Sequence, residues 1–285
     1  MKAGRGLTVA RMVELAQVSR AGFYRFDKDA PKRPDRDMDL RDAIQRIALE
    51  WPSYGRPRIT AELRRQGWKV NPKRVARLMR EDNLLCVRKR KFVVTTDSGH
   101  SRKVYPNLAA EMSLSTINQL WVADITYIRL QAEFVYLAVV IDAFSRRVIG
   151  WALERTLEDE LSLAALRMAL KSRRPSAGWV HHSDRGSQYA SIDYTELLKS
   201  HGCQISMSHK ASPWENAACE SWMKTLKSEE VYREEYRNLG EARECIEQFI
   251  EKIYNRRRLH SALGYRPPAE FERMLAAGGK GEGSA

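Results

Sequence analysis

The chain has 285 residues, 43% of them apolar, which is enough to fill a core in one large domain or two modest ones. Its formal net charge of +13 and isoelectric point near 9.7 predict a polyanionic partner, most simply the phosphate backbone of a nucleic acid. A membrane is excluded as the main partner, because the sequence has no run of about 18 apolar residues and no secretory leader. These properties predict a globular, cytosolic protein.

The four cysteines are scattered, with no C-x-x-C pair and no histidine at metal-ligand spacing beside them. They are Cys86, Cys203, Cys219 and Cys245. This distribution argues against a disulfide framework and against a structural zinc site.

Residues 1–87 are predicted to be helical, because apolar residues recur there at helical spacing without β-branched runs. The short helices are expected within 7–26, 39–51, 58–67 and 71–85. Ser19 is a candidate N-cap within the first segment. The last helix has a clear start, since Asn71 can cap it and Pro72 suits its first position.

The helix from 71 has an apolar stripe of Val75, Leu78 and Met79, which leaves its basic side chains exposed. One interpretation is a solvated face on a small bundle. We favour the other, in which this is the second helix of a helix-turn-helix, joined to 58–67 by a turn at 67–70. The DNA-binding region is then best supported at 54–85. Its expected DNA contacts are Lys73, Arg74 and Arg77.

Residues 88–112 are predicted to be a basic linker, because they mix Lys and Arg with Ser, Gly, Asp and Pro and show no sustained period. Beyond the linker, β-rich runs at 121–130, 133–144 and 146–154 predict an antiparallel meander. A helix at 158–173 and a strand at 179–184 then require a crossover, which makes that strand parallel to its neighbour. A helix at 191–202, a strand at 203–208 and a long helix from about Glu215 to Tyr232 follow.

This order predicts an α/β domain at 113–275, with a mixed five-stranded sheet flanked by helices, as in the ribonuclease-H-like fold. The all-helical, helix-turn-helix-type region precedes it, and a flexible tail is expected at 276–285.

Three carboxylates in this domain could converge. Asp124 lies in the middle of the first predicted strand, and alternation places it on the same face as its apolar neighbours Val122 and Ile128. A lone carboxylate is costly to bury there. Asp184 ends the parallel strand, where open sheets place ligand sites. Glu220 lies on the late helix, opposite its apolar face. Three carboxylates together need compensation, and oxygen-only ligation suits a pair of Mg²⁺ or Mn²⁺ ions, which can clamp a phosphoryl displacement.

Three blocks, "WVADITYI", "HSDRGSQY" and "SPWENAACESWMKTLKSE", resemble the catalytic blocks of DDE transposases with an integrase core. They are similar to the insertion-sequence group in which the second reading frame encodes that core. Thirty-five residues separate Asp184 from Glu220, the spacing typical of the group. The resemblance also covers "YGRPRITAELRRQGWKVNPKRVARLMREDNLL" and "YNRRRLHSALGYRPPAEF", and therefore most of the chain.

The resemblance implies that Asp124, Asp184 and Glu220 are catalytic and bind two Mg²⁺ or Mn²⁺ ions, and that Lys227 contacts the element's end. The implied reaction hydrolyses a phosphodiester at that end, and the freed 3′ hydroxyl then attacks a target strand. Relatives typically proceed through a circular intermediate copied by the host. The implied partners are the two DNAs and further copies of the chain in a synaptic complex. Because the chain opens almost at the second-frame region, an upstream-frame product or fusion is expected as well. A cytoplasmic, nucleoid-associated location follows.

Several other side chains have two interpretations. For Asp142 we favour capping its own turn over joining Asp124. Of His181 and His182 only one can face the site, and a buried, satisfied histidine is favoured over a ligand. Glu215 is interpreted as a residue at the start of a helix, where the helix dipole stabilises its negative charge.

Glu229 and Glu230 are expected on a solvated face, and Trp214 and Trp222 in packing rather than base stacking. For the basic run 256–258, DNA contact and simple solvation remain equally open.

Two alternative functions remain. One is a catalytically silent DNA-binding remnant that acts as a regulator. The other is a retroviral-type integrase, which we disfavour because the His-His-Cys-Cys zinc module expected near the N-terminus is missing from the sequence.

Overall fold

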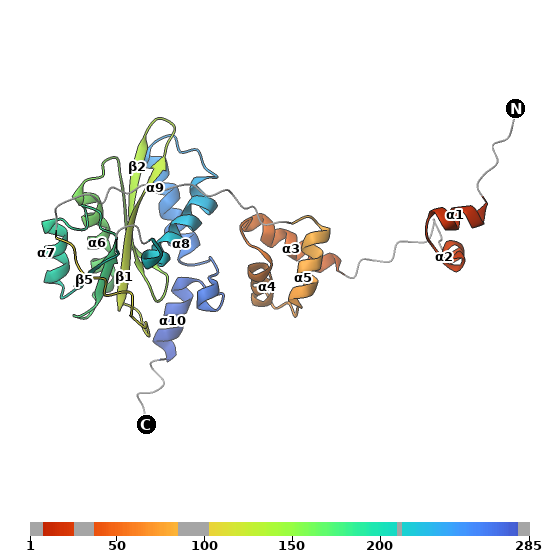
Figure 1. Cartoon of the computed structure of the whole chain (residues 1–285), viewed down its shortest axis with the longest axis horizontal. Coiled ribbons are helices and arrows are strands. Elements are labelled where there is room, and N and C mark those ends of the chain that lie inside the picture. Colours follow the sequence, from red (N-terminus) through yellow and green to blue (C-terminus); the bar gives the residue numbers. More distant parts are fainter. Residues whose placement is uncertain (1–7, 26–36, 85–102, 210–212, 279–285) are drawn as a thin grey trace, which may run out of the picture.

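The computed structural model describes residues 8–25, 37–84, 103–209 and 213–278 (Figure 1). The predicted linker lies outside these residues up to position 102. Two short helices come first, α1 (Val9–Leu15) and α2 (Arg20–Arg25). The Ser19 hydroxyl accepts the Gly22 N–H at 3.0 Å, which confirms Ser19 as a helix-capping residue.

Residues 37–84 form the three-helix unit that we call the helical module. It comprises α3 (Met38–Glu50), α4 (Arg56–Arg65) and α5 (Pro72–Glu81). The Asn71 side chain caps α5 by accepting the Lys73 N–H at 2.8 Å, as predicted. The turn between α4 and α5 contains Gly67 at φ +90°, a backbone conformation that glycine adopts without strain. The predicted helix-turn-helix arrangement of α4 and α5 is therefore present.

The core is a five-stranded mixed sheet in the order β3-β2-β1-β4-β5. Its strands are β1 (Leu120–Arg129), β2 (Phe134–Asp142), β3 (Val148–Glu154), β4 (Val180–Ser183) and β5 (Gln204–Met207). The first three pair antiparallel as a meander, while β4 is parallel to β1 and β5 is parallel to β4. The crossover before β4 therefore produces the predicted parallel strand.

Helices cover both faces of the sheet (Figure 1). On one face α6 (Asp159–Arg173) and α7 (Ile192–Ser200) pack over an apolar cluster that includes Trp121, Leu166 and Tyr194. On the other face α8 (Ala217–Leu226) and α9 (Leu239–Gln248) pack over a cluster that includes Trp222. The ribonuclease-H-like architecture predicted from the order of elements is confirmed.

The helix expected from Glu215 to Tyr232 is divided into three parts. A 3-10 turn, η1 (Pro213–Asn216), precedes α8, and a π-helical turn, η2 (Lys227–Val231), continues it. The division at the start has a physical cause, because the Asn216 side chain donates to the Ala123 carbonyl at 2.9 Å and ties this point of the chain to β1.

The C-terminal part adds a second π-helical turn, η3 (Phe249–Tyr254), a short 3-10 turn, η4 (Ser261–Leu263), and α10 (Pro268–Gly278). The tail predicted from 276 thus overlaps the last turn of α10, and 279–285 lie outside the described residues. The three described cysteines, Cys203, Cys219 and Cys245, are free thiols. In the part of the chain that the structure describes, no helix is long and apolar enough to cross a membrane.

Candidate active site

Asp124 lies on β1, and Asp184 follows directly after the end of the neighbouring strand β4. The pairing of β1 with β4 includes Val122 opposite His182, and each aspartate lies two residues beyond these partners. Because side chains alternate along a strand, both carboxylates belong to the same face of the sheet. The Asp184 carboxylate is held by the Gly186 N–H, which donates to its Oδ1 at 2.9 Å. The sheet register therefore brings two of the three predicted residues together.

The electrostatics of Asp124 show the effect of this proximity. Burial and then the negative charge of Asp184 raise the pKa of Asp124 to about 7. The Ile125 N–H, which donates to Oδ1 of Asp124 at 2.8 Å, and the Lys227 ammonium oppose that rise. Two carboxylates in this arrangement are a site where a divalent cation would relieve a real electrostatic cost.

Glu220 lies on α8 and raises the pKa of Asp124 further, but its own carboxylate is turned to another partner. It accepts the Lys224 ammonium at 2.8 Å, and its side chain is 46% exposed. Within the described ranges, no three His, Cys, Asp or Glu side chains gather closely enough to hold a metal ion. An ion pair this exposed contributes only about 0–1 kcal/mol, so a rotation of Glu220 towards the two aspartates is inexpensive.

Two further residues, one at each end of α8, lie near Asp124. Asn216 anchors the start of the helix beside Asp124, because its side chain donates to the Ala123 carbonyl. Lys227 follows the end of the helix, with its Nζ 4.9 Å from the Tyr127 ring centroid. Burial lowers the pKa of Lys227, while the nearby Asp124 opposes that change. The predicted DNA contact Lys227 is thus adjacent to the carboxylates.

The other predicted DNA contacts lie on α5, apart from the sheet (Figure 1). Lys73 is exposed. Arg74 and Arg77 both pair with Asp37, the latter at 2.6 Å, and Arg77 also pairs with Glu81 at 2.9 Å. Contact of either arginine with DNA would therefore require it to exchange a carboxylate for a phosphate.

Asp142 has the structural role that we favoured. Its Oδ1 accepts the N–H groups of Phe144 at 3.0 Å and Ser145 at 2.8 Å, and its Oδ2 accepts that of Asn118 at 2.6 Å. In the β1–β2 register it lies opposite Trp121, away from Asp124. Its capping of the turn is confirmed.

The two histidines before Asp184 are buried, as favoured, but only one ring nitrogen of each has a hydrogen-bond partner among the described residues. The ring of His181 contacts the Tyr194 hydroxyl at 2.9 Å, and the ring of His182 contacts the Ser206 hydroxyl at 2.8 Å. Alternation places His182 on the same face as Asp184 and His181 on the opposite face.

These histidines predict acid sensitivity. Burial lowers the pKa of His181 to about 3 and that of His182 to about 4, so the folded state keeps them neutral while the unfolded chain binds protons. The contribution of these histidines to stability is therefore complete above about pH 6.5 and falls below it by about 1.4 kcal/mol per histidine for each pH unit. Urea unfolding at pH 7 and pH 5.5 should show a smaller loss for His182→Asn than for the wild type. Equal losses in the two proteins would contradict this assignment.

The prediction that Glu229 and Glu230 lie on a solvated face was wrong; both belong to the turn η2 that follows α8. Glu229 is not solvated, because it is buried in an ion pair with Arg258, and Glu230 accepts the Tyr236 hydroxyl at 3.0 Å. Glu215 carries more than a helix-dipole role, since it accepts both the His209 N–H at 2.6 Å and the His209 ring at 2.9 Å.

Trp222 is packed in the core as expected, while the side chain of Trp214 lies outside the described residues. In the basic run 256–258, Arg258 is buried and Arg257 pairs with Glu50. Neither is simply solvated.

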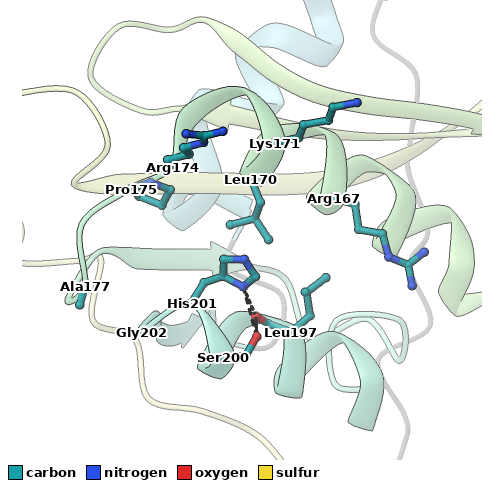
Figure 2. A pocket seen from close by; sticks show the side chains of 10 residues that line it. All are labelled: Arg167, Leu170, Lys171, Arg174, Pro175, Ala177, Leu197, Ser200, His201 and Gly202. Atoms are coloured by element: carbon teal, nitrogen blue, oxygen red, sulfur yellow. Dashed lines mark hydrogen bonds between the residues drawn. The ribbon is translucent and has the colours of Figure 1, made fainter.

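A pocket of about 650 Å³ lies elsewhere, between the C-terminal ends of α6 and α7 (Figure 2). Its basic lining residues are Arg167, Lys171, Arg174 and His201. None of the three carboxylates lines it. Cations at helix C-termini complement the helix dipole, which accounts for these side chains.

Known protein families match both parts of the chain. A family described as "Integrase core domain" matches residues 115–213, and a second family of that description matches 201–268. A family described as "HTH-like domain" matches residues 35–92.

Among individual proteins, the uncharacterized 31 kDa protein of insertion element IS600 from Shigella sonnei is 40% identical over 264 residues, covering 91% of this chain and 97% of that protein. Transposase InsF for insertion sequence IS3A from Escherichia coli (strain K12) is 36% identical over 271 residues, covering 93% and 94%.

Solved structures of viral proteins are also similar. The simian T-cell lymphotropic virus intasome, in complex with PP2A regulatory subunit B56 gamma, shares 16% identity at a TM-score of 0.44, over 81% of this chain and 74% of that one. The HTLV-2 integrase catalytic core domain in complex with magnesium shares 15% identity at a TM-score of 0.40, over 54% and 96%.

The helical module and the ribonuclease-H-like sheet define a protein with an HTH-like domain and an integrase core, the class of DNA transposases and integrases. Proteins of this class are polynucleotidyl transferases that act on DNA. The chain belongs to the IS3 family of insertion-sequence transposases.

Proposed function

We propose that the chain cuts DNA at the ends of its insertion sequence and joins the freed 3′ ends to a target strand, using Asp124, Asp184 and Glu220 with Mg²⁺ or Mn²⁺. The observation that carries the proposal is the proximity of Asp124 on β1 to Asp184, the residue that follows β4, whose charge helps to raise the pKa of Asp124 to about 7. A pair of half-buried carboxylates with a mutual electrostatic cost is what a divalent cation stabilises.

The chemistry of the donor set fits a hard cation, because all three side chains offer oxygen ligands. Bound there, two such ions would supply charge stabilisation for the attacking and leaving oxygens of an in-line displacement. The residues of the chain then have separate tasks. Gly186 orients the Asp184 carboxylate through its N–H. Asn216 holds the start of α8 against β1, so that Glu220 can turn from Lys224 to the aspartates.

DNA binding is assigned to two surfaces. Lys227 lies beside the carboxylates and can contact a phosphate at the element's end. On α5, Lys73, Arg74 and Arg77 are placed on the exposed side of the second helix of the helix-turn-helix, where they can contact the end's outer sequence. The helical region 1–87, the linker 88–112 and the catalytic domain 113–275 would thus divide recognition from chemistry.

Strand transfer by such an enzyme needs two element ends held together, so we include a homo-oligomer in the synaptic complex. An upstream-frame product or fusion would complete recognition of the ends. Because its substrate is chromosomal DNA, the protein would work in the cytoplasm, at the nucleoid.

The experiment uses a labelled duplex that carries the terminal repeat flanking the gene. The wild type with Mg²⁺ or Mn²⁺ should cleave one strand at the end, while Glu220→Gln should bind equally and cleave at least about 10³-fold less. Gel analysis separates cleavage from strand joining, and omission of the metal is the control. Binding without cutting by both proteins, even after fusion to the upstream-frame product, would favour the alternative of a silent DNA-binding regulator.

A further inference from the structure

The segment between η3 and α10 packs against the helical module, most closely at Leu259. Leu259 is 1% exposed and belongs to the apolar cluster of the module, beside Ile59 and Leu63. Its N–H donates to the Tyr54 hydroxyl at 2.8 Å, and its carbonyl accepts Nε of Arg58 at 3.2 Å. The module therefore holds both the backbone and the side chain of this residue.

Two ion pairs lie around this contact. Arg65 of α4 donates to both carboxylate oxygens of Glu270 on α10, at 3.0 and 2.7 Å. Arg257 pairs with Glu50 of α3. Exposed pairs of this kind contribute little energy, so the contact depends mainly on the buried Leu259.

The next residue along the chain, Arg258, turns towards the catalytic domain. It donates from Nε and a terminal nitrogen to both oxygens of Glu229, at 2.7 and 2.8 Å. The two side chains are only 4% and 8% exposed. The Glu229 carboxylate also receives a hydrogen bond from Ser53 of the helical module. Such a bidentate, buried pair tolerates little change in geometry, because moving one partner would leave a charge buried without compensation.

Glu229 lies in the π-helical turn η2, which continues α8 without a break. It is nine residues beyond Glu220 and two beyond Lys227. A helix transmits rotation and translation along its length, and π-helical turns are frequent at functional sites. A continuous set of contacts thus runs from Tyr54 and Leu259 through the ion pair to the helix that carries the catalytic glutamate.

We propose that the Arg258–Glu229 pair is a positioning link, which couples engagement of DNA by the helical module to the placement of Glu220 and Lys227. The inference rests on the proposed function. When the module binds the element's end, Leu259 and Arg258 follow it, and the pair carries that displacement into η2 and α8. Coupling between two sites is reciprocal, so the position of α8 that places Glu220 for catalysis also favours the DNA-bound position of the helical module. Cleavage is in this way restricted to DNA that the module has recognised.

The test replaces the pair by apolar residues of similar size, Glu229→Leu with Arg258→Met, because such replacement of a buried pair usually preserves folding. The full-length double variant should bind the end as the wild type does but cleave it about tenfold more slowly. Its half-saturating Mn²⁺ concentration should rise, since Glu220 is less well placed. Its preference for the true end over a scrambled end should fall. A purely structural role would move the melting temperature and leave the last two quantities unchanged.

A second variant, Arg258→Lys, keeps the positive charge but loses the bidentate geometry, so it should show an intermediate loss of cleavage rate. It keeps the test decisive if the double variant fails to fold. Tyr54→Phe removes the acceptor for the Leu259 N–H and should reproduce part of the loss. Combined with the double variant, it should add nothing further, because both changes interrupt one set of contacts. The matched control is Arg65→Gln, which removes an exposed pair at the same contact and should cleave normally.

Wild-type rates, metal requirement and end preference in a folded double variant, or in Arg258→Lys if the double variant does not fold, would overturn the link while leaving the proposed function intact. Failure of the wild type itself to cleave, with Glu220→Gln indistinguishable from it, would instead contradict the proposed function.

Discussion

Replacing Asp124 with asparagine is expected to reduce end cleavage by about 10³-fold or more, because it removes the charged side chain that we propose as a metal ligand, a contribution worth several kcal/mol in the transition state. The same change should make the metal-free protein more stable at alkaline pH. The pKa of Asp124 is raised to about 7, so the folded state retains a proton that the unfolded chain has already released. The contribution of Asp124 to wild-type stability therefore falls as pH rises from about 4 to about 7, and the variant lacks that loss.

Thermal unfolding in EDTA from pH 5 to pH 8.5 measures the second effect. The melting temperature of Asp124→Asn should exceed that of the wild type by an amount that grows with pH and levels off above pH 7. Asparagine can still accept the Ile125 N–H, so the local geometry is kept. Asp193→Asn, an exposed change on α7, is the matched control and should show no such trend. A variant less stable than the wild type at pH 8 would contradict the assignment.

Replacing Gly150 with alanine is expected to destabilise the catalytic domain by about 3 kcal/mol or more, at or beyond the upper end of ordinary overpacking. Gly150 lies on β3 beneath α6. A Cβ there would stand 2.2 Å from the Ala165 carbonyl oxygen and 2.8 Å from the Ala169 nitrogen. Both atoms belong to the helix backbone, so α6 as a whole would have to shift. Denaturant unfolding of the full chain measures the loss.

The control for this prediction is Gly55→Ala, where the added Cβ would meet only Pro57 at 3.9 Å, and where a loss of about 1 kcal/mol or less is expected. Ala169→Gly in the Gly150→Ala background removes one side-chain contact at 2.9 Å but leaves the clash with the Ala165 carbonyl. It should therefore restore little stability. Full recovery would show that the helix backbone is not the obstacle.

Helices and strands in both parts of the chain could be predicted because the sequence patterns that define them extend over only a few residues. The alternation along β1 and the Asn71–Pro72 start of α5 depend on neighbours in the chain, and the structure has both. The crossover rule then predicted that β4 is parallel to its neighbour, and the order of the strands came from the structure. The broken helix around Asn216 could not be anticipated, since its cause is a hydrogen bond to β1, 93 residues earlier in the chain.

The carboxylates illustrate the same limit at the site. Their motifs and the 35 residues between Asp184 and Glu220 identify three candidates. That Asp124 and Asp184 share a level follows from the strand register, and that Glu220 rests on Lys224 follows from a side-chain rotation on α8. Neither is encoded in a local pattern.

Composition, periodicity and motif spacing were sufficient to predict a basic nucleic-acid protein and a helix-turn-helix followed by a ribonuclease-H-like core, and to single out three acidic residues as candidates. Each of these depends on residue type and short-range order. The raised pKa of Asp124, the burial of Glu229 with Arg258 and the seat of Leu259 on the helical module came from the folded chain. Electrostatic energy, hydrogen bonding and burial depend on distances between atoms that lie far apart in the sequence. Glu229 was expected on a solvated face because the sequence carries no information about which other segment covers that face.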